Sequence, residues 1–142
     1  MTTTVELLRQ KPAVVHSIGP DAPVLEAIKR MAEHGIGALL VMRGGELLGV
    51  VSERDYARKV ILQGRSSSDT PVREIMSSPV ITVRPDQTAR ACMQIMTERR
   101  VRHLPVMAGG QLLGVLSIGD LVREVLEEQQ QTIEQLEHYI HS

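Results

Sequence analysis

Two serine–aspartate pairs carry the residue types and spacing in this chain that could do chemistry. Ser52 and Asp55 stand three positions apart after an apolar run, and Ser117 and Asp120 do the same. A serine at a helix N-cap with an acid three residues later predicts a capping box, in which each side chain accepts a hydrogen bond from the other residue's amide. The same geometry offers helix amides to a phosphate and two carboxylate oxygens to ribose hydroxyls. The pattern therefore predicts a helix cap, a nucleotide site, or both.

The two pairs belong to an internal repeat. Residues 43–55 return at 108–120 with the same Gly-Gly, Leu-Leu-Gly-Val and Ser-x-x-Asp spacing. The offset of 65 positions continues without a gap from Pro20/Pro85 to Val60/Val125. A repeat of this length predicts two copies of one supersecondary unit.

Each copy is expected to run strand, helix, strand, turn, strand, helix. In the first copy, Asp21 is the predicted cap of a helix that ends at Gly35, and Gly44-Gly45 is the predicted turn. The predicted strands are 13–18, 36–42 and 46–51, and the last helix covers 52–62. The second copy has predicted strands over 80–83, 101–107 and 111–116, a turn at Gly109-Gly110, and helices over 88–99 and from 117 towards 140.

The predicted division of the chain follows the repeat. Short helices over 5–10 and 72–76 lead into the copies. We expect a first repeat with its lead-in helix over 1–62, a polar connector over 63–69, a second repeat over 70–127 and a helical extension over 128–142.

The last predicted helix carries an apolar seam at alternating spacings of four and three, which is typical of a two-helix packing surface. Its positions are Val122, Leu126, Gln129, Ile133, Leu136 and Ile140. Two interpretations stay open: the helix lies on its own core, or it packs against a helix from a second copy of the chain.

Composition narrows the class of protein. The 142 residues are 42% hydrophobic but include no Phe and no Trp, so a planar ligand would sit between aliphatic side chains. A net charge of −1 argues against nucleic-acid binding. The single cysteine, Cys92, excludes an internal disulfide and is expected to be a small buried residue. The N-terminus shows no signal peptide, and the longest apolar run, 38–42, is too short to span a membrane, so we expect a cytoplasmic protein.

The two copies differ in the strand before the turn. The second copy has Arg102 and His103 where the first has Gly37 and Ala38. A packing role does not require this change, so Arg102 and His103 are candidate phosphate ligands, with a solvated strand end as the alternative. In the first copy, Arg54 is the candidate substitute.

Three segments together resemble the CBS (cystathionine-β-synthase) domain. They are the lead-in over 72–80, the strand Arg-His-Leu-Pro-Val over 102–106 and the segment over 113–120 that ends in Ser-Ile-Gly-Asp. The resemblance covers residues of about 4 to 127 in tandem and implies a standalone Bateman module. That module is an α/β fold in which two β-α-β-β-α units pack through their sheets with pseudo-twofold symmetry and bind nucleotides in the clefts between them.

The resemblance also implies the site residues. The ribose-binding acids are Asp55 and Asp120, each with its serine, Ser52 or Ser117. The residues near the base are Ser17 and Ile18 in the first copy and Ile81 and Thr82 in the second; the strand and helix-start positions are Gly37, Ala38, Arg54, Arg102, His103, Pro105 and Ile118. Leu40 stands where the second copy has Pro105, so the second site is favoured.

The predicted function is that of a regulatory module without catalysis. An adenosine nucleotide would bind, with AMP first and ATP, ADP, NAD or S-adenosylmethionine as alternatives, and a protein effector would respond in trans. The resemblance also implies a homodimer. No P-loop, Gly-x-Ser-x-Gly or His-Glu-x-x-His motif is present, which argues against an enzyme and a catalytic cofactor. A purely structural dimer or scaffold is the main alternative, and an enzyme acting on a nucleotide is the weaker one.

Overall fold

Each repeat folds around a β-hairpin whose turn is the Gly-Gly pair. Strand β2 (Ala38–Arg43) pairs antiparallel with β3 (Glu46–Ser52), and β4 (His103–Ala108) pairs antiparallel with β5 (Gln111–Ser117). All four turn glycines have positive φ angles, between 56° and 85°. A two-residue turn of this type needs positive φ at both positions, which glycine adopts at little cost, so both predicted turns are confirmed.

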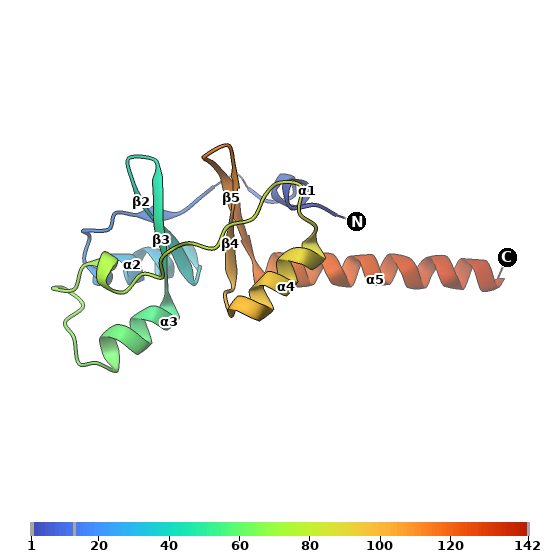
Figure 1. Cartoon of the computed structure of the whole chain (residues 1–142). Helices are drawn as coiled ribbons and strands as arrows, with labels where there is room; N and C mark the ends of the chain where they lie inside the picture. Colours follow the sequence, from blue (N-terminus) through green and yellow to red (C-terminus); the bar gives the residue numbers. More distant parts are fainter. Residues whose placement is uncertain (1, 13, 142) are drawn as a thin grey trace. The chain divides into compact units, whose positions relative to one another are not determined.

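The computed structural model, which describes residues 2–12 and 14–141, divides into two compact units (Figure 1). Unit 1 consists of Met1–Val14 and Ile81–Ser142, and unit 2 consists of Val15–Val80. The lead-in of the first repeat (5–10) therefore lies in unit 1 with the second repeat. The lead-in of the second repeat (72–76) lies in unit 2 with the first repeat. The compact units therefore do not coincide with the sequence boundaries 1–62 and 70–127.

The first strand of each copy is shorter than predicted. In unit 2, β1 (Ser17–Ile18) adds in parallel to β2, while Ala13 lies outside the described residues. In unit 1, the predicted strand 80–83 is reduced to a single parallel bridge between Val83 and Val106.

Pro105 gives the physical reason for the missing strand in unit 1. In unit 2 the amide of Leu40 donates to the carbonyl of His16, at 3.2 Å. Pro105 occupies the position of Leu40 in the second copy and has no amide hydrogen to donate, so the parallel ladder cannot extend past Val83 in that direction.

Helices α2 (Val24–His34) and α4 (Ala89–Arg99) are equivalent in the two copies. Thr88 caps α4 by accepting a hydrogen bond from the Ala91 amide at 3.1 Å, whereas Pro23 stands at the N-cap of α2. The predicted cap by Asp21 is wrong, because this residue lies before the helix start and pairs with Arg43 and Arg73 instead. Helix α2 ends at Gly35, as predicted, with φ 63°.

The remaining helices flank the hairpins. Ser52 is followed by α3 (Glu53–Tyr56), which continues as the π-helical turn η1 (Ala57–Ile61). Ser117 is followed by the long α5 (Ile118–His141). The predicted lead-in helices are α1 (Thr4–Arg9) in unit 1 and the 3₁₀ turn η2 (Val72–Glu74) in unit 2.

Two strand glycines allow the lead-in segments to pack closely. A Cβ on Gly49 would lie 2.7 Å from the sulfur of Met76 and 2.9 Å from the carbonyl oxygen of Ser77. A Cβ on Gly114 would lie 2.8 Å from a methyl carbon of Leu8. The duplicated Leu-Leu-Gly-Val motif therefore provides the space in which a lead-in crosses the hairpin.

Each unit has its own aliphatic core. The core of unit 2 includes Met31, Leu39 and Val51, and that of unit 1 includes Leu104, Leu116 and Leu121. Cys92 is buried in the core of unit 1, as predicted, and burial raises the pKa of its thiol to about 11.

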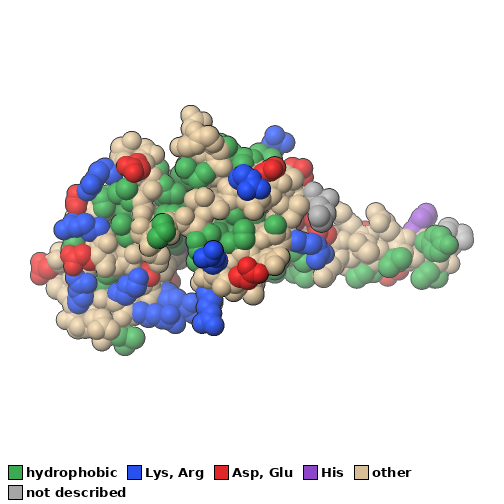
Figure 2. Space-filling view, in the orientation of Figure 1, with side chains coloured by type: hydrophobic (Ala, Val, Ile, Leu, Met, Phe, Trp, Pro, Cys, Tyr) green, Lys and Arg blue, Asp and Glu red, His purple; other side chains and the backbone are tan. Residues whose placement is uncertain are grey.

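Helix α5 continues well past α4 (Figure 1). Its first turns pack on unit 1 through the buried residues Leu121 and Glu124. The apolar seam positions are exposed by 39% to 73%, and Figure 2 shows hydrophobic side chains along this part of the helix. The exposed seam positions are Val122, Leu126, Ile133, Leu136 and Ile140. The first turns of the helix therefore lie on the core of unit 1, but the apolar seam does not.

Candidate functional site

The Ser52–Asp55 pair forms a complete capping box at the start of α3. The amide of Ser52 donates to Oδ2 of Asp55 at 3.0 Å, and the amide of Asp55 donates to Oγ of Ser52 at 3.1 Å. Strand β3 delivers Ser52 to the helix start in an extended conformation, which lets its side chain fold back over the first turn. The predicted cap is confirmed in this copy.

The Ser117–Asp120 pair repeats this geometry at the start of α5. The amide of Ser117 donates to Oδ2 of Asp120 at 2.8 Å, and the amide of Asp120 donates to Oγ of Ser117 at 3.2 Å. Both serine–aspartate pairs therefore cap helices, and the duplicated spacing has a structural role in each unit.

The helix starts offer fewer amides to a phosphate than the sequence pattern indicates. The amide of Glu53 donates to the carbonyl of Gly37 at 3.0 Å, and that of Ile118 donates to the carbonyl of Arg102 at 2.9 Å. Together with the capping bonds, these contacts engage the first and third amides of each helix. A phosphate at either helix start would therefore depend on the second amide, that of Arg54 or Gly119.

A lysine pairs with the aspartate in each unit. In unit 2, Nζ of Lys59 lies 3.2 Å from Oδ1 of Asp55 and donates to the carbonyl of Ile75 at 2.9 Å. In unit 1, Nζ of Lys11 lies 2.7 Å from Oδ2 of Asp120 and donates to the carbonyl of Val115 at 2.8 Å.

The sequence reasoning missed both lysines. Lys59 follows Asp55 by four positions on one helix, a spacing that could have indicated the pair. Lys11 is separated from Asp120 by 109 positions, and no sequence pattern connects them.

Asp120 is held in its ionised form. Burial by itself raises the pKa of the Asp120 carboxyl. Hydrogen bonds from Lys11 and Ser117 and the positive charge of Lys11 lower this pKa by more than burial raises it, so the net pKa lies below its usual value. The hydrogen bonds from Lys11 Nζ and the Ser117 amide, and the ion pair with Lys11, all end on Oδ2. Oδ1 is the acceptor of none of these contacts.

His103 lies beside this carboxylate. It faces Ser117 across the β4–β5 pair. Burial lowers the pKa of His103, the charges of Lys11 and Arg102 lower it further, and the charge of Asp120 opposes them. The imidazole is therefore neutral at physiological pH, although a bound phosphate would favour its protonated form.

The other predicted site residues differ in how far they are exposed. Arg54, Thr82 and Arg102 are exposed, whereas Ile18 and Pro105 are buried. The carbonyl of Ser17 accepts a hydrogen bond from Arg30 at 2.7 Å. The partly buried residues are Gly37, Ala38, Ile81 and Ile118, of which Ile81 and Ile118 pack against the core of unit 1.

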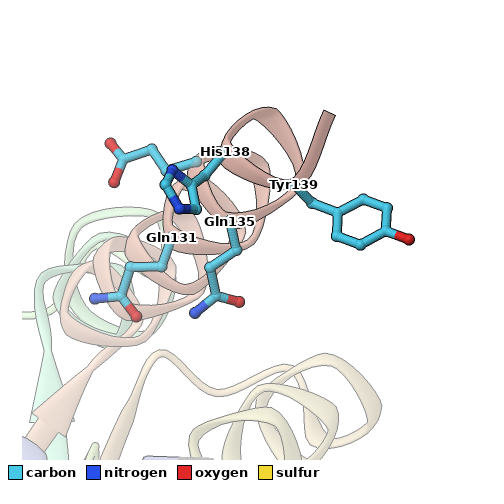
Figure 3. Close-up of a pocket in the computed structure, with 5 residues that line it drawn as sticks. Gln131, Gln135, His138 and Tyr139 are labelled. Atoms are coloured by element: carbon cyan, nitrogen blue, oxygen red, sulfur yellow. The ribbon is translucent and has the colours of Figure 1, made fainter. Parts of the chain in front are cut away.

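Two hollows among the described residues add little to these sites. One hollow beside Lys11 and Asp120 has a volume of about 30 Å³, on the scale of a single water molecule. Another lies along the end of α5, where Gln131, Gln135 and His138 point to one side and Tyr139 to the other (Figure 3). All of its lining residues come from α5, so this hollow is the surface of one helix and not a ligand cleft.

The described residues contain no group of three or more His, Cys, Asp or Glu side chains placed to hold a metal ion. Among the same residues, no helix is long and apolar enough to cross a membrane.

Comparison with known families explains the repeat. The CBS domain family matches twice, at residues 6–61 and 72–127. The chain belongs to the CBS domain family. The mixed α/β fold with two CBS repeats and a C-terminal helix, predicted from the sequence, is thereby confirmed.

Individual CBS proteins are similar over most of this chain. The mitochondrial CBS domain-containing protein CBSX3 of Arabidopsis thaliana is 44% identical over 84% of this chain and 61% of its own length. YhcV of Bacillus subtilis is 33% identical over 75% of this chain and 76% of its own length. The chain thus spans only part of these relatives.

A solved structure of a CBS protein from Burkholderia ambifaria MC40-6 has a TM-score of 0.87 and 51% identity, covering 90% of this chain and 96% of that chain. A CBS domain pair solved with 5′-methylthioadenosine and S-adenosyl-L-methionine has a TM-score of 0.75 over 90% of this chain and 98% of that chain. Its identity of 24% supports a shared fold only.

Proposed function

We propose that this CBS pair senses an adenosine nucleotide and has no catalytic activity of its own. The single observation that supports the proposal best is Asp120, an ionised and partly buried carboxylate at a helix start whose Oδ1 accepts neither the Lys11 nor the capping hydrogen bond. The solved CBS pair that holds two adenosine derivatives has the same fold.

The proposed roles differ along the site. Asp120 accepts hydrogen bonds from the ribose, while Arg102 and His103 contact the phosphate. Because burial and neighbouring cations lower the pKa of His103, an arriving phosphate dianion would draw a proton onto this imidazole. Ser52, Asp55 and Arg54 form the equivalent site of unit 2, with Gly37 and Ala38 supplying no charged group there.

AMP is the first candidate ligand, because one phosphate matches one Arg-His pair; ATP, ADP, NAD and S-adenosylmethionine are the alternatives. Binding would alter a surface that a protein effector reads in trans. The proposed location is the cytoplasm, although CBSX3 carries a mitochondrial name.

Thermal unfolding of ligand-stripped protein tests the proposal. A ligand at one hundred times its dissociation constant stabilises a protein by about 2.7 kcal/mol, which is a measurable rise in melting temperature. We expect Asp120→Asn to remove most of the rise, because Asn can still accept the capping hydrogen bond but carries no charge.

Asp86→Asn is the matched control, since this exposed carboxylate pairs only with Arg84 among the ion pairs of the described chain. If none of the five adenosine ligands shifts the melting temperature, the proposal fails and the scaffold interpretation replaces it. Conversion of a nucleotide by the purified protein would instead support an enzyme.

Calorimetry at pH 7 tests the role of His103. Titrations of AMP in buffers of different ionisation enthalpy should show proton uptake in the wild type and little in His103→Gln. Equal uptake in both proteins would assign the proton to another group.

A further inference from the structure

We propose that the exposed half of α5 pairs antiparallel with α5 of a second copy of this chain. This surface lies outside the proposed nucleotide sites. Its seam positions are exposed, and the helix beneath them is already formed and anchored on unit 1 by Leu121 and Glu124. An anchored helix loses less conformational entropy on pairing than a free peptide of the same length.

The spacing of the seam fits a second copy in reverse direction. In two helices related by a twofold axis near residue 131, Val122 faces the partner's Ile140 and Leu126 faces the partner's Leu136. Gln129 faces the partner's Ile133. Each of the six seam positions thus faces a seam position of the partner, and no seam residue lies outside the paired region.

The charges beside the seam distinguish the two directions. Arg123 and Glu137 occupy equivalent flanking positions of the heptad, and both are exposed. In an antiparallel pair, Arg123 of each chain faces the partner's Glu137, which gives two opposite-charge contacts. In a parallel pair, Arg123 faces the partner's Ile118 and Glu137 faces the partner's Thr132, so neither charge is matched.

Cysteine cross-linking of the full chain tests the direction. Leu126→Cys and Leu136→Cys proteins are purified separately, mixed while reduced and then oxidised. We expect a disulfide-linked dimer of the two different variants, and little from either variant alone. The native Cys92 does not compete, because it is buried and its thiol pKa is raised to about 11.

A cross-link within each variant alone would show a parallel pair and overturn the proposal. So would the absence of any cross-link at micromolar to millimolar concentration, because the exposed seam would then have no second copy on it.

Charge reversal provides a second test that leaves the seam intact. We expect Arg123→Glu, and separately Glu137→Arg, to raise the concentration needed for half-maximal cross-linking about tenfold, and the double variant to restore it. Glu134→Arg is the matched control, since it makes the same change in charge one turn away on the face opposite the seam. Equal effects of Glu137→Arg and Glu134→Arg, or no restoration in the double variant, would refute the antiparallel register.

Discussion

In both units a lysine pairs with the aspartate of the Ser-x-x-Asp element, but the lysine comes from the helix in unit 2 and from the lead-in in unit 1. In unit 2, Lys59 stands on the helix and reaches out to the lead-in at Ile75. In unit 1, Lys11 stands on the lead-in and reaches in to β5 and Asp120. Both lysines tie a lead-in to the capped helix start, so the same tie is made by a different residue in each unit.

This difference affects the site. Lys59 engages Oδ1 of Asp55, and the capping amide engages Oδ2, so both carboxylate oxygens of unit 2 are occupied. Lys11 and the capping amide share Oδ2 of Asp120. At the proposed second site Oδ1 of Asp120 therefore lies outside these contacts, whereas a ribose at the first site would compete with Lys59 for Oδ1 of Asp55. Sequence symmetry between the repeats does not make their sites equivalent.

The largest difference between the units is expected at the strand glycines. Gly49→Ala places a Cβ against the backbone carbonyl of Ser77, which cannot move alone, and should cost about 2–3 kcal/mol of unfolding free energy. Gly114→Ala meets only the end of the Leu8 side chain, which can rotate, and should cost about 1 kcal/mol. Urea unfolding followed by circular dichroism measures both, and equal costs would contradict the comparison.

The next difference concerns the lysines. Lys11→Met should cost about 1–2 kcal/mol, because a side chain that is 32% exposed loses two hydrogen bonds and leaves Asp120 without its cation. Lys59→Met should cost about 0.5–1 kcal/mol, since Lys59 is 45% exposed and its ion pair is longer.

Hydrogen exchange by mass spectrometry locates the two effects. Lys11→Met should accelerate exchange in α1 and β5, and Lys59→Met in η2. Lys29→Met, an exposed lysine on α2, is the control. If both variants accelerate the same segments, the lead-ins do not belong to separate units.

The third difference is a pH dependence confined to unit 1. Burial lowers the pKa of His103 below 6.5, so its contribution to stability is complete above that pH and is lost as the pH falls through the lower pKa of the folded state. The pKa of Asp120 is also lowered, from 3.8, so its contribution to stability is present above that pH and is lost as the pH falls through its lower folded-state pKa. Wild-type stability should therefore fall as the pH drops below about 6.5 towards 5.5, and His103→Gln should flatten this slope. An unchanged slope would show that another group carries it.

The smallest difference lies at the ends of the equivalent helices α2 and α4. Gly35 and Arg100 both adopt the left-handed conformation, with φ 63° and 56°. This conformation strains an arginine but not a glycine, so Arg100→Gly should stabilise the protein by about 0.5–1 kcal/mol. Gly35→Ala should destabilise it by about 1 kcal/mol, and the melting temperatures of the two variants should move in opposite directions.

Local sequence signals predicted the local structure well. The glycine pairs determined the turns, Gly35 determined a helix end, and the Ser-x-x-Asp spacing determined two capped helix starts, because each depends on residues within a few positions. Two predictions failed. Asp21 does not cap α2, because the N-cap position falls on Pro23. The strand over 80–83 does not form, because its partner strand has Pro105, 22 positions after Val83, where an amide donor would be needed.

The sequence by itself determined the repeat, the fold family and the capped serine–aspartate pairs, since these follow from spacing and from short-range hydrogen bonds. Only the tertiary structure decided that each lead-in crosses the other repeat's hairpin and that Lys11 pairs with Asp120. It also decided that the seam of α5 is exposed. The lead-in crossings and the Lys11–Asp120 pair depend on contacts between segments far apart in the sequence, which no local pattern encodes. The seam is visible as a heptad pattern, but its exposure depends on which surfaces the rest of unit 1 covers.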